Sequence, residues 1–317
     1  MVTELMDAHG IVLRRDALAA GYDDNALARF VKAGFVTRIR HGAYVSTAIW
    51  SGLDKQAQHN TLSRAVLKQY DDSVALTHDS AAVRHGGPTY GLDLSSVHLL
   101  HLPGGTGTRT GRRNVAGIVH HKGSVRVLDV TRNDGAWLTS PVRTILDVAM
   151  TRGVEAGLIA ADDFIRRGLT SKIELWLVYE CVRDWPGALI LRLVIDRCDG
   201  KAESVGETLG RELFRKHLLP MPIPQFEVFR ADGSLAGRTD WAWPEHKLFG
   251  EFDGKVKYLR FRKPGETVTQ AVLREKKRED ELRELTDFGF IRLIWTDLFC
   301  GERTASRVRA KLRRRAA

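Results

Sequence analysis

The stretch GIVLRRDALAAGYDDNALARFVKAGFVTRIRHGAYV, residues 10–45, decides the fold of the first part of this chain. Its first half predicts two short helices separated by Gly21, a residue suited to the left-handed turn that ends a helix. Asp23 or Asp24 provides the N-cap of the second of these helices. In residues 35–46, apolar and polar side chains then alternate, which predicts two strands around a tight turn. A short amphipathic helical turn precedes the stretch, so three helices are followed by a two-stranded hairpin.

This order is that of a winged helix-turn-helix, in which the third helix enters the major groove of DNA and the wing lies along the backbone. Six polar residues on these two elements are therefore candidates for DNA contact. They are Asn25, Arg29 and Lys32 on the third helix and Arg38, Arg40 and His41 on the wing. The alternative is a solvated polar face on a small scaffold domain, because residues 1–50 carry a net charge of only +1.

The pattern over residues 10–45 resembles the N-terminal domain of AbiEi-type antitoxins, the DNA-binding half of type IV toxin–antitoxin pairs. THDSAAVRHG (77–86) and TSPVRTILDVA (139–149) resemble the middle region of actinobacterial members of this family. The resemblance implies a cytoplasmic, sequence-specific protein that binds double-stranded DNA and represses its own promoter. It also implies a protein partner, a cognate toxin that is encoded nearby.

The charge of the chain is concentrated in two short segments. The net charge of the 317 residues is +10, of which residues 101–130 carry +4 and the last seventeen residues carry +6. Nucleic acid is the partner that such a balance suggests. We expect phosphate contacts from a glycine-rich loop, residues 103–114, and from a basic C-terminal tail that begins at Arg307. The loop residues concerned are Arg109, Arg112 and Arg113.

The composition excludes several other classes of protein. Hydrophobic residues make up 43% of the chain and charged residues 28%, which argues against wholesale disorder. No apolar run approaches the roughly 20 residues of a membrane helix, so no membrane partner is expected. The three cysteines share no metal-ligand spacing and predict reduced thiols in the cytoplasm.

Residues 51–200 predict a mixed α/β middle region. Helices are expected over 54–70, near 77–86, from Pro141 after an N-capping Ser140, and over 154–167, 172–182 and 188–199. Strands are expected over 97–102, 117–121 and 125–130. Eight of the eleven histidines lie between His41 and His121. Alternating strand positions with solvated imidazoles account for them better than a metal cluster, so we predict no zinc site.

Residues 203–299 predict a helix, a three-stranded meander, a charged helix and a final strand, which is the core order of the PD-(D/E)XK nuclease superfamily. Period-two alternation places Glu251, Asp253 and Lys255 on one face of the third strand, with Asp240 on its neighbour. Converging carboxylates favour Mg²⁺, so Asp240, Glu251 and Asp253 are the candidate metal ligands. The lysine could then orient or deprotonate the attacking water.

RTDWAWPEHKLFGEFDGK, residues 238–255, resembles the very-short-patch-repair-like branch of that superfamily. The resemblance implies that Glu207 on the preceding helix is an additional acidic ligand. The sequence allows two registers, because the (D/E)xK signature begins at either Glu251 or Asp253. A degenerate site fits this pattern as well as an active one, and hydrolysis is the less favoured outcome. Cross-strand pairing of acidic and basic side chains is a structural alternative.

The charged helix over 269–288 offers Arg274 and Arg278 as candidates for phosphate contact, against the alternative of a solvated, salt-bridged helix. Together these features predict a multidomain α+β protein. Its parts are a winged helix-turn-helix (1–50), the middle region (51–200) and a restriction-endonuclease-like α/β domain with a basic tail (201–317).

Two functions from different classes follow from this division. The favoured function is a sequence-specific DNA-binding regulator of the antitoxin kind, with a nuclease-like domain that is non-catalytic. The alternative is an Mg²⁺-dependent DNA endonuclease that the winged helix directs to its target, and Mg²⁺ is expected as a cofactor only in that case. A third possibility makes the C-terminal half an interaction surface.

Overall fold

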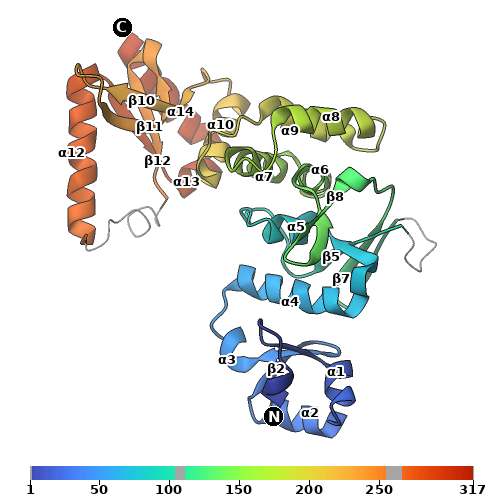
Figure 1. Cartoon of the computed structure of the whole chain (residues 1–317). Coiled ribbons are helices and arrows are strands. Elements are labelled where there is room, and N and C mark those ends of the chain that lie inside the picture. The colour runs from blue at the N-terminus through green and yellow to red at the C-terminus, as the bar shows by residue number, and fades with distance from the viewer. Residues whose placement is uncertain (1, 104–110, 255–265, 317) are drawn as a thin grey trace. The chain divides into compact units, whose positions relative to one another are not determined.

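The computed structural model describes residues 2–103, 111–254 and 266–316, without the side chains of 71, 111–113, 268, 272 and 314–316. It is a multidomain α+β protein with three sheets in the described part of the chain (Figure 1). The chain forms two compact units. The first comprises Met1–Ala160 and Leu169–Arg197, and the second comprises Ala161–Gly168 and Cys198–Ala317.

The first fifty residues form a small head with a three-stranded sheet, in the order β1-β3-β2. Its elements are a 3-10 turn (Val2–Leu5), β1 (Ile11–Leu13), α1 (Arg14–Ala19), α2 (Asp24–Lys32), β2 (Val36–Arg40), β3 (Ala43–Ser46) and α3 (Thr47–Trp50). The Asp23 carboxylate caps α2 by accepting from Ala26 N at 2.7 Å, as the sequence predicted. The prediction of a helix from residue 11 was wrong, because Ile11 and Val12 are β-branched and pair with β3.

The middle region contains a six-stranded mixed sheet in the order β6-β7-β5-β4-β9-β8. Its strands are β4 (Val74–Leu76), β5 (Val97–His101), β6 (Gly111–Val115), β7 (Ile118–Lys122), β8 (Val130–Asn133) and β9 (Ala136–Thr139). The sequence predicted β5 and β7, but β4, β6 and β9 were missed. Residues 127–129, expected within a strand, form a 3-10 turn, and β8 begins only at Val130.

The helices of the middle region follow the predicted positions. They are α4 (Lys55–Tyr70), α5 (His78–Arg84), α6 (Pro141–Arg152), α7 (Val154–Arg166), α8 (Lys172–Val182) and α9 (Ala188–Arg197), with a 3-10 turn at Asp71–Ser73. Ser140 caps α6, with Pro141 at the first helical position. Helix α4 also packs against the head, because Ala65 shares a buried apolar cluster with Ile11 and Val45.

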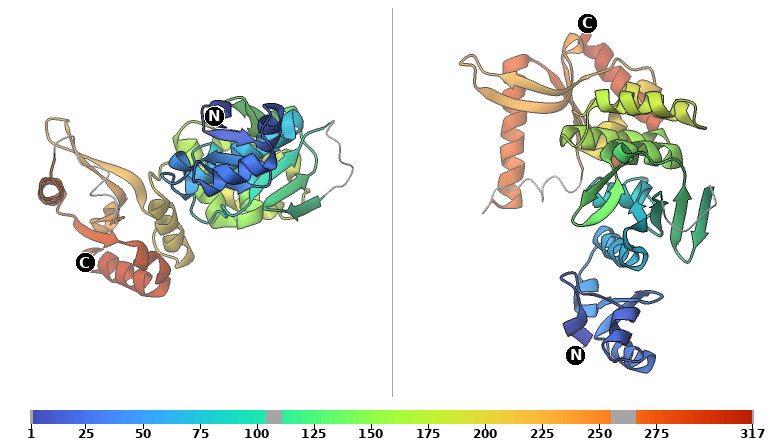
Figure 2. Two further views of the ribbon diagram at one scale, coloured as in Figure 1. Left: turned by 90° about the horizontal axis from the view of Figure 1, so that it is seen from below. Right: turned by 45° about the vertical axis from the view of Figure 1, so that its right-hand side comes forward.

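The second unit contains a four-stranded sheet in the order β10-β11-β12-β13, with β12 and β13 parallel. The sequence predicted this element order through β13. Figure 2 shows two further views of the chain. The elements are α10 (Val205–Lys216), β10 (Ile223–Phe229), β11 (Leu235–Trp243), a 3-10 turn (Pro244–His246), β12 (Leu248–Phe252), α12 (Val268–Thr286), β13 (Gly289–Leu293), α13 (Trp295–Phe299) and α14 (Gly301–Ala316).

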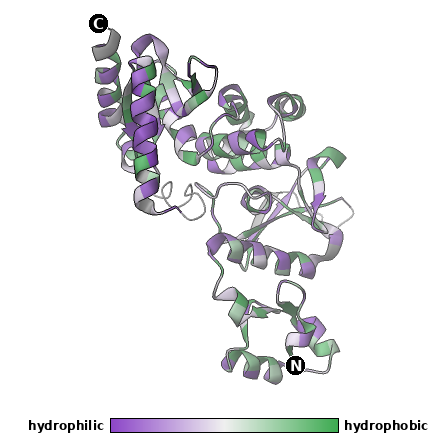
Figure 3. Ribbon diagram, turned by 60° about the vertical axis from the view of Figure 1, so that its left-hand side comes forward, coloured by the Kyte–Doolittle hydropathy of each residue, from purple (hydrophilic) through white to green (hydrophobic). Residues whose placement is uncertain are grey.

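This sheet is covered on both faces. Alternation along the strands sends Trp241 and Phe252 towards α10 and α14. It sends Ala242 and Phe249 to the opposite face, where they pack with Leu282 of α12. Apart from such contacts, α12 is mainly hydrophilic (Figure 3).

The basic stretch from Arg307 is helical, not a tail. It belongs to α14, whose Ala305, Val308 and Leu312 are buried in the same core as Trp241. Their spacing of three and four residues forms one apolar stripe, and Arg303, Arg307 and Arg313 lie exposed outside it. The C-terminal charge is therefore carried by an element of the folded domain.

The end of α7 belongs to the second unit, where Asp162 forms a buried ion pair with Arg211 of α10. Arg211 Nη2 lies 2.7 Å from Asp162 Oδ2, and both side chains are buried. Thr208 donates to the same oxygen at 2.8 Å. Removing one partner of such a pair costs about 3–5 kcal/mol, because the other charge stays buried. In the described part of the chain, no helix is long and apolar enough to cross a membrane.

Candidate functional site

The exposed side of α2 carries the three residues predicted to contact DNA. Asn25, Arg29 and Lys32 are exposed, while Ala26 and Leu27 face the core of the head. No ion pair involves Arg29 or Lys32 among the described residues, and their charge faces solvent. Cations of this kind are the groups that bind phosphate.

The three residues predicted to lie on a wing, in the hairpin of β2 and β3, differ from one another in exposure. Arg38 and His41 are exposed, but Arg40 is half-buried, and burial lowers its pKa below the ordinary value of arginine. The Nε and Nη1 atoms of Arg40 have no hydrogen-bond partner among the described atoms. The His41 carbonyl accepts from Gln69 Nε2 of α4 at 3.1 Å, so the turn between β2 and β3 is held against the middle region.

The basic loop lies largely beyond the described part of the chain. Arg109 is outside the described residues. The backbone of Arg112 and Arg113 lies on β6, which pairs with β7, but their side chains are not described. Their predicted contact with phosphate therefore stays a prediction.

In the second unit, the sheet brings Asp240 and Glu251 together. Trp241 pairs with Gly250 in the antiparallel register of β11 and β12, so the two carboxylates are cross-strand neighbours on the α12 face. Asp240 Oδ2 accepts from Phe252 N at 2.7 Å. Asp253 follows directly after β12, and its backbone N–H donates to Leu293 O at 2.7 Å. Lys255 lies outside the described residues.

Glu207 belongs to a different environment. Helix α10 packs on the Trp241 face of the sheet, opposite the face of Asp240 and Glu251. The Glu207 carboxylate is buried and accepts from Ser204 Oγ at 2.7 Å and from Gln225 Nε2 at 2.7 Å. These bonds tie the start of α10 to β10. Its described side-chain partners are therefore Ser204 at the start of α10 and Gln225 of β10.

Arginines occupy the side of the sheet on which Glu251 lies. Arg278 Nη2 of α12 contacts both Glu251 Oε1 and Glu275 Oε1, and Arg278 Nη1 donates to Arg238 O at 2.9 Å. Arg292 Nη2 of β13 lies 3.5 Å from Glu251 Oε2. Burial raises the pKa of Glu251, while Arg278 opposes this shift. Burial alone would lower the pKa of Arg278, but its two acidic partners raise it.

The described contacts of Glu251 are not those of a Mg²⁺ ligand. A hard divalent cation needs carboxylate oxygens that point at it, and both oxygens of Glu251 already face guanidinium groups. Arg274, the other predicted phosphate contact on α12, pairs with Glu266 at 2.9 Å. Arg274 and Arg278 are therefore both engaged in ion pairs within the domain.

The middle sheet gathers polar residues that the sequence analysis did not connect. Thr77 Oγ1 donates to Asp147 Oδ2 at 2.8 Å, and Arg143 Nε donates to Asp147 Oδ1 at 2.8 Å. Arg143 Nη1 also lies 3.1 Å from Asp129 Oδ2. The signal was present in the sequence, since the two family-like blocks, 77–86 and 139–149, supply Thr77, Arg143 and Asp147.

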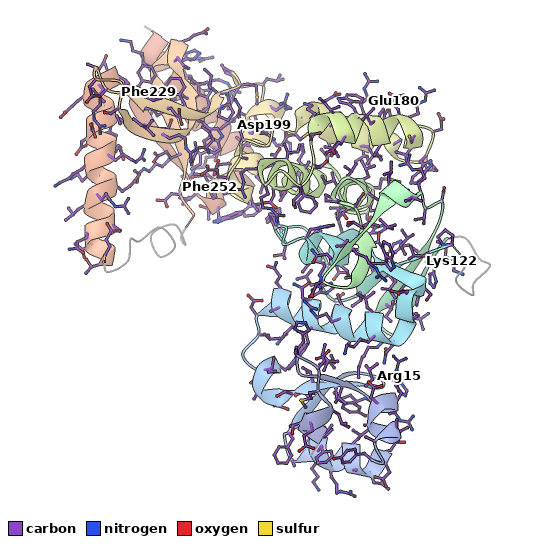
Figure 4. The ribbon with its side chains drawn as sticks, in the orientation of Figure 1. Arg15, Lys122, Glu180, Asp199, Phe229 and Phe252 are labelled. Carbon is purple, nitrogen blue, oxygen red and sulfur yellow. The ribbon has the colours of Figure 1, made fainter. Side chains whose placement is uncertain are left out.

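The strand histidines form two contacting pairs on opposite faces of this sheet. His98 Nδ1 lies 3.0 Å from His121 Nε2 on one face, and His101 Nε2 lies 3.0 Å from His120 Nδ1 on the other. His98 is only 1% exposed, so the prediction of solvated imidazoles was wrong for this residue. Figure 4 labels Lys122, which follows His121 at the end of β7.

One family model matches the N-terminal part of the chain. Residues 1–47 match the family model described as "Transcriptional regulator, AbiEi antitoxin". This match supports the AbiEi-type resemblance of the head, and it ends near the close of the head at Trp50.

Two mycobacterial proteins are similar over a longer stretch. They are "Uncharacterized protein MT2308" and "Uncharacterized protein Rv2248" from two strains of Mycobacterium tuberculosis. Each is 24% identical to this chain over 255 residues, which cover 76% of this chain and 90% of the relative. The similarity therefore extends well beyond the head.

Proposed function

We propose that this protein is a DNA-binding transcriptional regulator of the AbiEi antitoxin kind. The observation that carries the proposal is the match of residues 1–47 to that family, on a segment whose α2 presents Arg29 and Lys32 to solvent without an ion pair among the described residues. Helix α2 serves as the recognition helix of a winged helix-turn-helix, and the hairpin of β2 and β3 serves as the wing.

In this proposal, different residues of the head contact the phosphates and the bases of the DNA. Arg14 is paired with Asp24 at 2.6 Å, so part of the basic charge of the head is neutralised internally. Arg29, Lys32 and Arg38 supply the phosphate contacts. Asn25 is positioned to read a base edge, since its amide both donates and accepts hydrogen bonds.

The test is a titration of the protein with the duplex upstream of its own gene and with random duplex, at about 150 mM salt. We expect tighter binding to the upstream duplex. The double substitution Arg29→Ala with Arg38→Ala should weaken this binding. The matched control is Arg183→Ala with Arg192→Ala, which removes the same charge from exposed ion pairs on α8 and α9. Equal affinity for both duplexes, or equal loss in both variants, contradicts the proposal.

The C-terminal unit has the element order of a PD-(D/E)XK domain, and we assign it a non-catalytic role. The contacts of Arg278 and Arg292 with Glu251 support this assignment. Incubation with Mg²⁺ or Mn²⁺ and plasmid, nicked or single-stranded DNA should give no cleavage. Cleavage that disappears in Asp240→Ala and in Asp253→Ala would instead establish the endonuclease.

A cognate toxin is the protein partner that this function entails. The neighbouring gene is where its coding sequence is expected, as in toxin–antitoxin pairs generally. Co-expression of the two genes, followed by purification of the full chain, should recover a stable complex. Recovery of the full chain alone would remove the toxin from the proposal and leave DNA binding to be judged by the titration.

A further inference from the structure

Three histidines from different elements of the middle region meet on one face of its sheet. His78 is the first residue of α5, His98 lies on β5 and His121 lies on β7. Each ring offers one nitrogen, and the three nitrogens lie within 4.8 Å of one another. We propose that these histidines bind a divalent transition-metal ion of the Zn²⁺ class.

The fold brings the three rings together in a defined way. β5 and β7 are parallel neighbours in which His98 pairs with Val119, so His121 lies two residues further along the same face. β4 delivers the chain to α5 beside β5, which places the His78 ring against both others. The ring centroids of His78 and His121 are 3.8 Å apart, and those of His78 and His98 are 5.4 Å apart.

The distances suit a shared ion after a small adjustment. Zn–N bonds of about 2.0–2.1 Å in tetrahedral geometry place ligand nitrogens roughly 3.3 Å apart. His98 Nδ1 and His121 Nε2 are 3.0 Å apart. In the ion-free protein, one of these nitrogens donates and the other accepts. When the ion binds, the donor ring takes its other tautomer and both nitrogens present lone pairs.

The type of ligand indicates which ion fits the site. Imidazole nitrogen is a common ligand of transition metals, and three imidazoles suit Zn²⁺ and its neighbours in the first transition row.

The surroundings of His78 resemble the outer shell of a metal site. Its Nδ1 lies 3.0 Å from Thr77 Oγ1 and 3.9 Å from the Asp147 carboxylate. A hydroxyl or carboxylate on the second nitrogen fixes the orientation of a ligating imidazole. His78 also has a φ of +50°, a conformation that persists only where the surroundings fix it.

The site has a route for the ion and a position for a fourth ligand. His98 is buried, but His78 and His121 are partly exposed. Three protein ligands with partial access to solvent leave one coordination position for water or for an anionic group. The identity of the ion follows from the imidazole ligands. Mg²⁺ and Ca²⁺ prefer oxygen ligands and are not expected here.

β5 and β7 also carry a second pair of histidines, which serves as the control for metal binding. His101 and His120 contact each other at 3.0 Å on the opposite face, next to Tyr70 of α4. This pair is not part of a cluster of three metal-ligating residues within the described chain. Loss of a histidine from this pair should therefore leave metal binding intact.

The experiment is a titration of the full-length, metal-free protein with Co²⁺, followed by its visible absorption and by competition with Zn²⁺. We expect one Co²⁺ per chain, with the bands of a four- or five-coordinate nitrogen and oxygen site. His78→Gln and His121→Gln should each lower the affinity by more than roughly 100-fold, the upper range for loss of an outer-shell partner. His101→Gln and His120→Gln should leave it unchanged.

Circular dichroism and the urea midpoint of each variant show whether that variant is folded. His78 and His121 are chosen for replacement because they are partly exposed, and because their replacement leaves the buried His98 in place. Several results would overturn the proposal. They are the absence of saturable binding by the folded wild type, undiminished binding by the double variant of His78 and His121, and intense thiolate-to-cobalt bands that report cysteine ligands. Equal loss of affinity in the His101 and His120 variants would also overturn it.

Discussion

Individual residues in this protein are constrained chiefly by what lies directly against them. Gly210 of α10 is an example, because a Cβ built there would lie 2.5 Å from the Trp241 ring. The helix can approach the sheet this closely only if that position has no side chain. The pairing of a small residue with a tryptophan thus sets the spacing between α10 and β11.

Gly210→Ala should therefore lower the free energy of unfolding of the second unit by about 1–3 kcal/mol, the usual cost of overpacking a core. Urea denaturation followed by tryptophan fluorescence measures this change. Gly123→Ala is the control, since nothing lies within 4 Å of the added Cβ. Similar free energies for both variants would show that α10 can move away from the sheet at little cost.

Because of His59, we expect the stability of the middle region to depend on pH. Its ring is buried, with Nδ1 at 3.0 Å from Leu94 O and Nε2 at 3.0 Å from Ser80 Oγ, and burial lowers its pKa. Between the lowered pKa and the ordinary value near 6.5, the unfolded chain binds the proton and the folded chain does not. The contribution of His59 to the free energy of unfolding is therefore fully present above pH 6.5, and it is lost as the pH falls from there towards the lowered pKa.

The free energy of unfolding should consequently fall more between pH 7.5 and 5.5 in the wild type than in His59→Gln. Urea titrations at both pH values measure the difference. His41→Gln, which changes an exposed histidine, is the control variant. An identical fall in the wild type and in His59→Gln would assign the pH dependence to other groups.

At the scale of elements, α14 gives the most direct test of the fold. Leu312 is 3% exposed and packs with Ala305 and Val308 against the core of the second unit. Leu312→Ala should lower the free energy of unfolding by about 2–5 kcal/mol, through lost burial and a cavity. Thermal and urea unfolding measure this loss. Lys311→Ala on the exposed side should change it by less than about 0.5 kcal/mol.

The sequence predicted elements well where period and turn signals agree. Strands β10 to β12 alternate cleanly and are separated by a turn at Asp232–Gly233 and by Pro244, so their order was evident. β1 was missed because three residues are too short to show a period next to an amphipathic helix. In α14, the run of arginines obscured an apolar stripe of three small and medium side chains.

The candidate sites were predictable only in part, for a physical reason. Alternation along β11 and β12 was enough to place Asp240 beside Glu251. The position of Arg278 depends on how α12 packs on the sheet, a long-range contact that no local pattern encodes. The histidine cluster is similar, since its three members come from elements up to 43 positions apart and meet only through the parallel pairing of β5 and β7.

For the whole molecule, the distribution of charge predicts how binding responds to salt. The exposed cations of α14 include Arg303, Lys311 and Arg313, whereas Arg307 pairs with Asp297 at 2.9 Å. Each phosphate contact that releases a counterion adds about 0.9 to the slope of log affinity against log salt. If the proposed DNA binding holds, we expect the first three side chains to supply attraction that is independent of DNA sequence.

Replacing Arg303, Lys311 and Arg313 together by Ala should reduce this slope for random duplex by up to about 3. The preference for the upstream duplex over random duplex should remain, because the head supplies it. Titrations between 50 and 200 mM salt measure both quantities. The control replaces Arg166, Arg183 and Arg192 by Ala, and an equal change in slope there would show that the position of the charge does not matter.

The route of the chain between its two compact units limits how this protein can be divided. Residues 161–168 belong to the second unit, yet they precede the segment 169–197, which belongs to the first. A gene fragment that begins at Cys198 would encode Arg211 without Asp162, leaving a buried guanidinium without that carboxylate. Recombination that exchanged a C-terminal module at this point would therefore break a buried ion pair of the second unit.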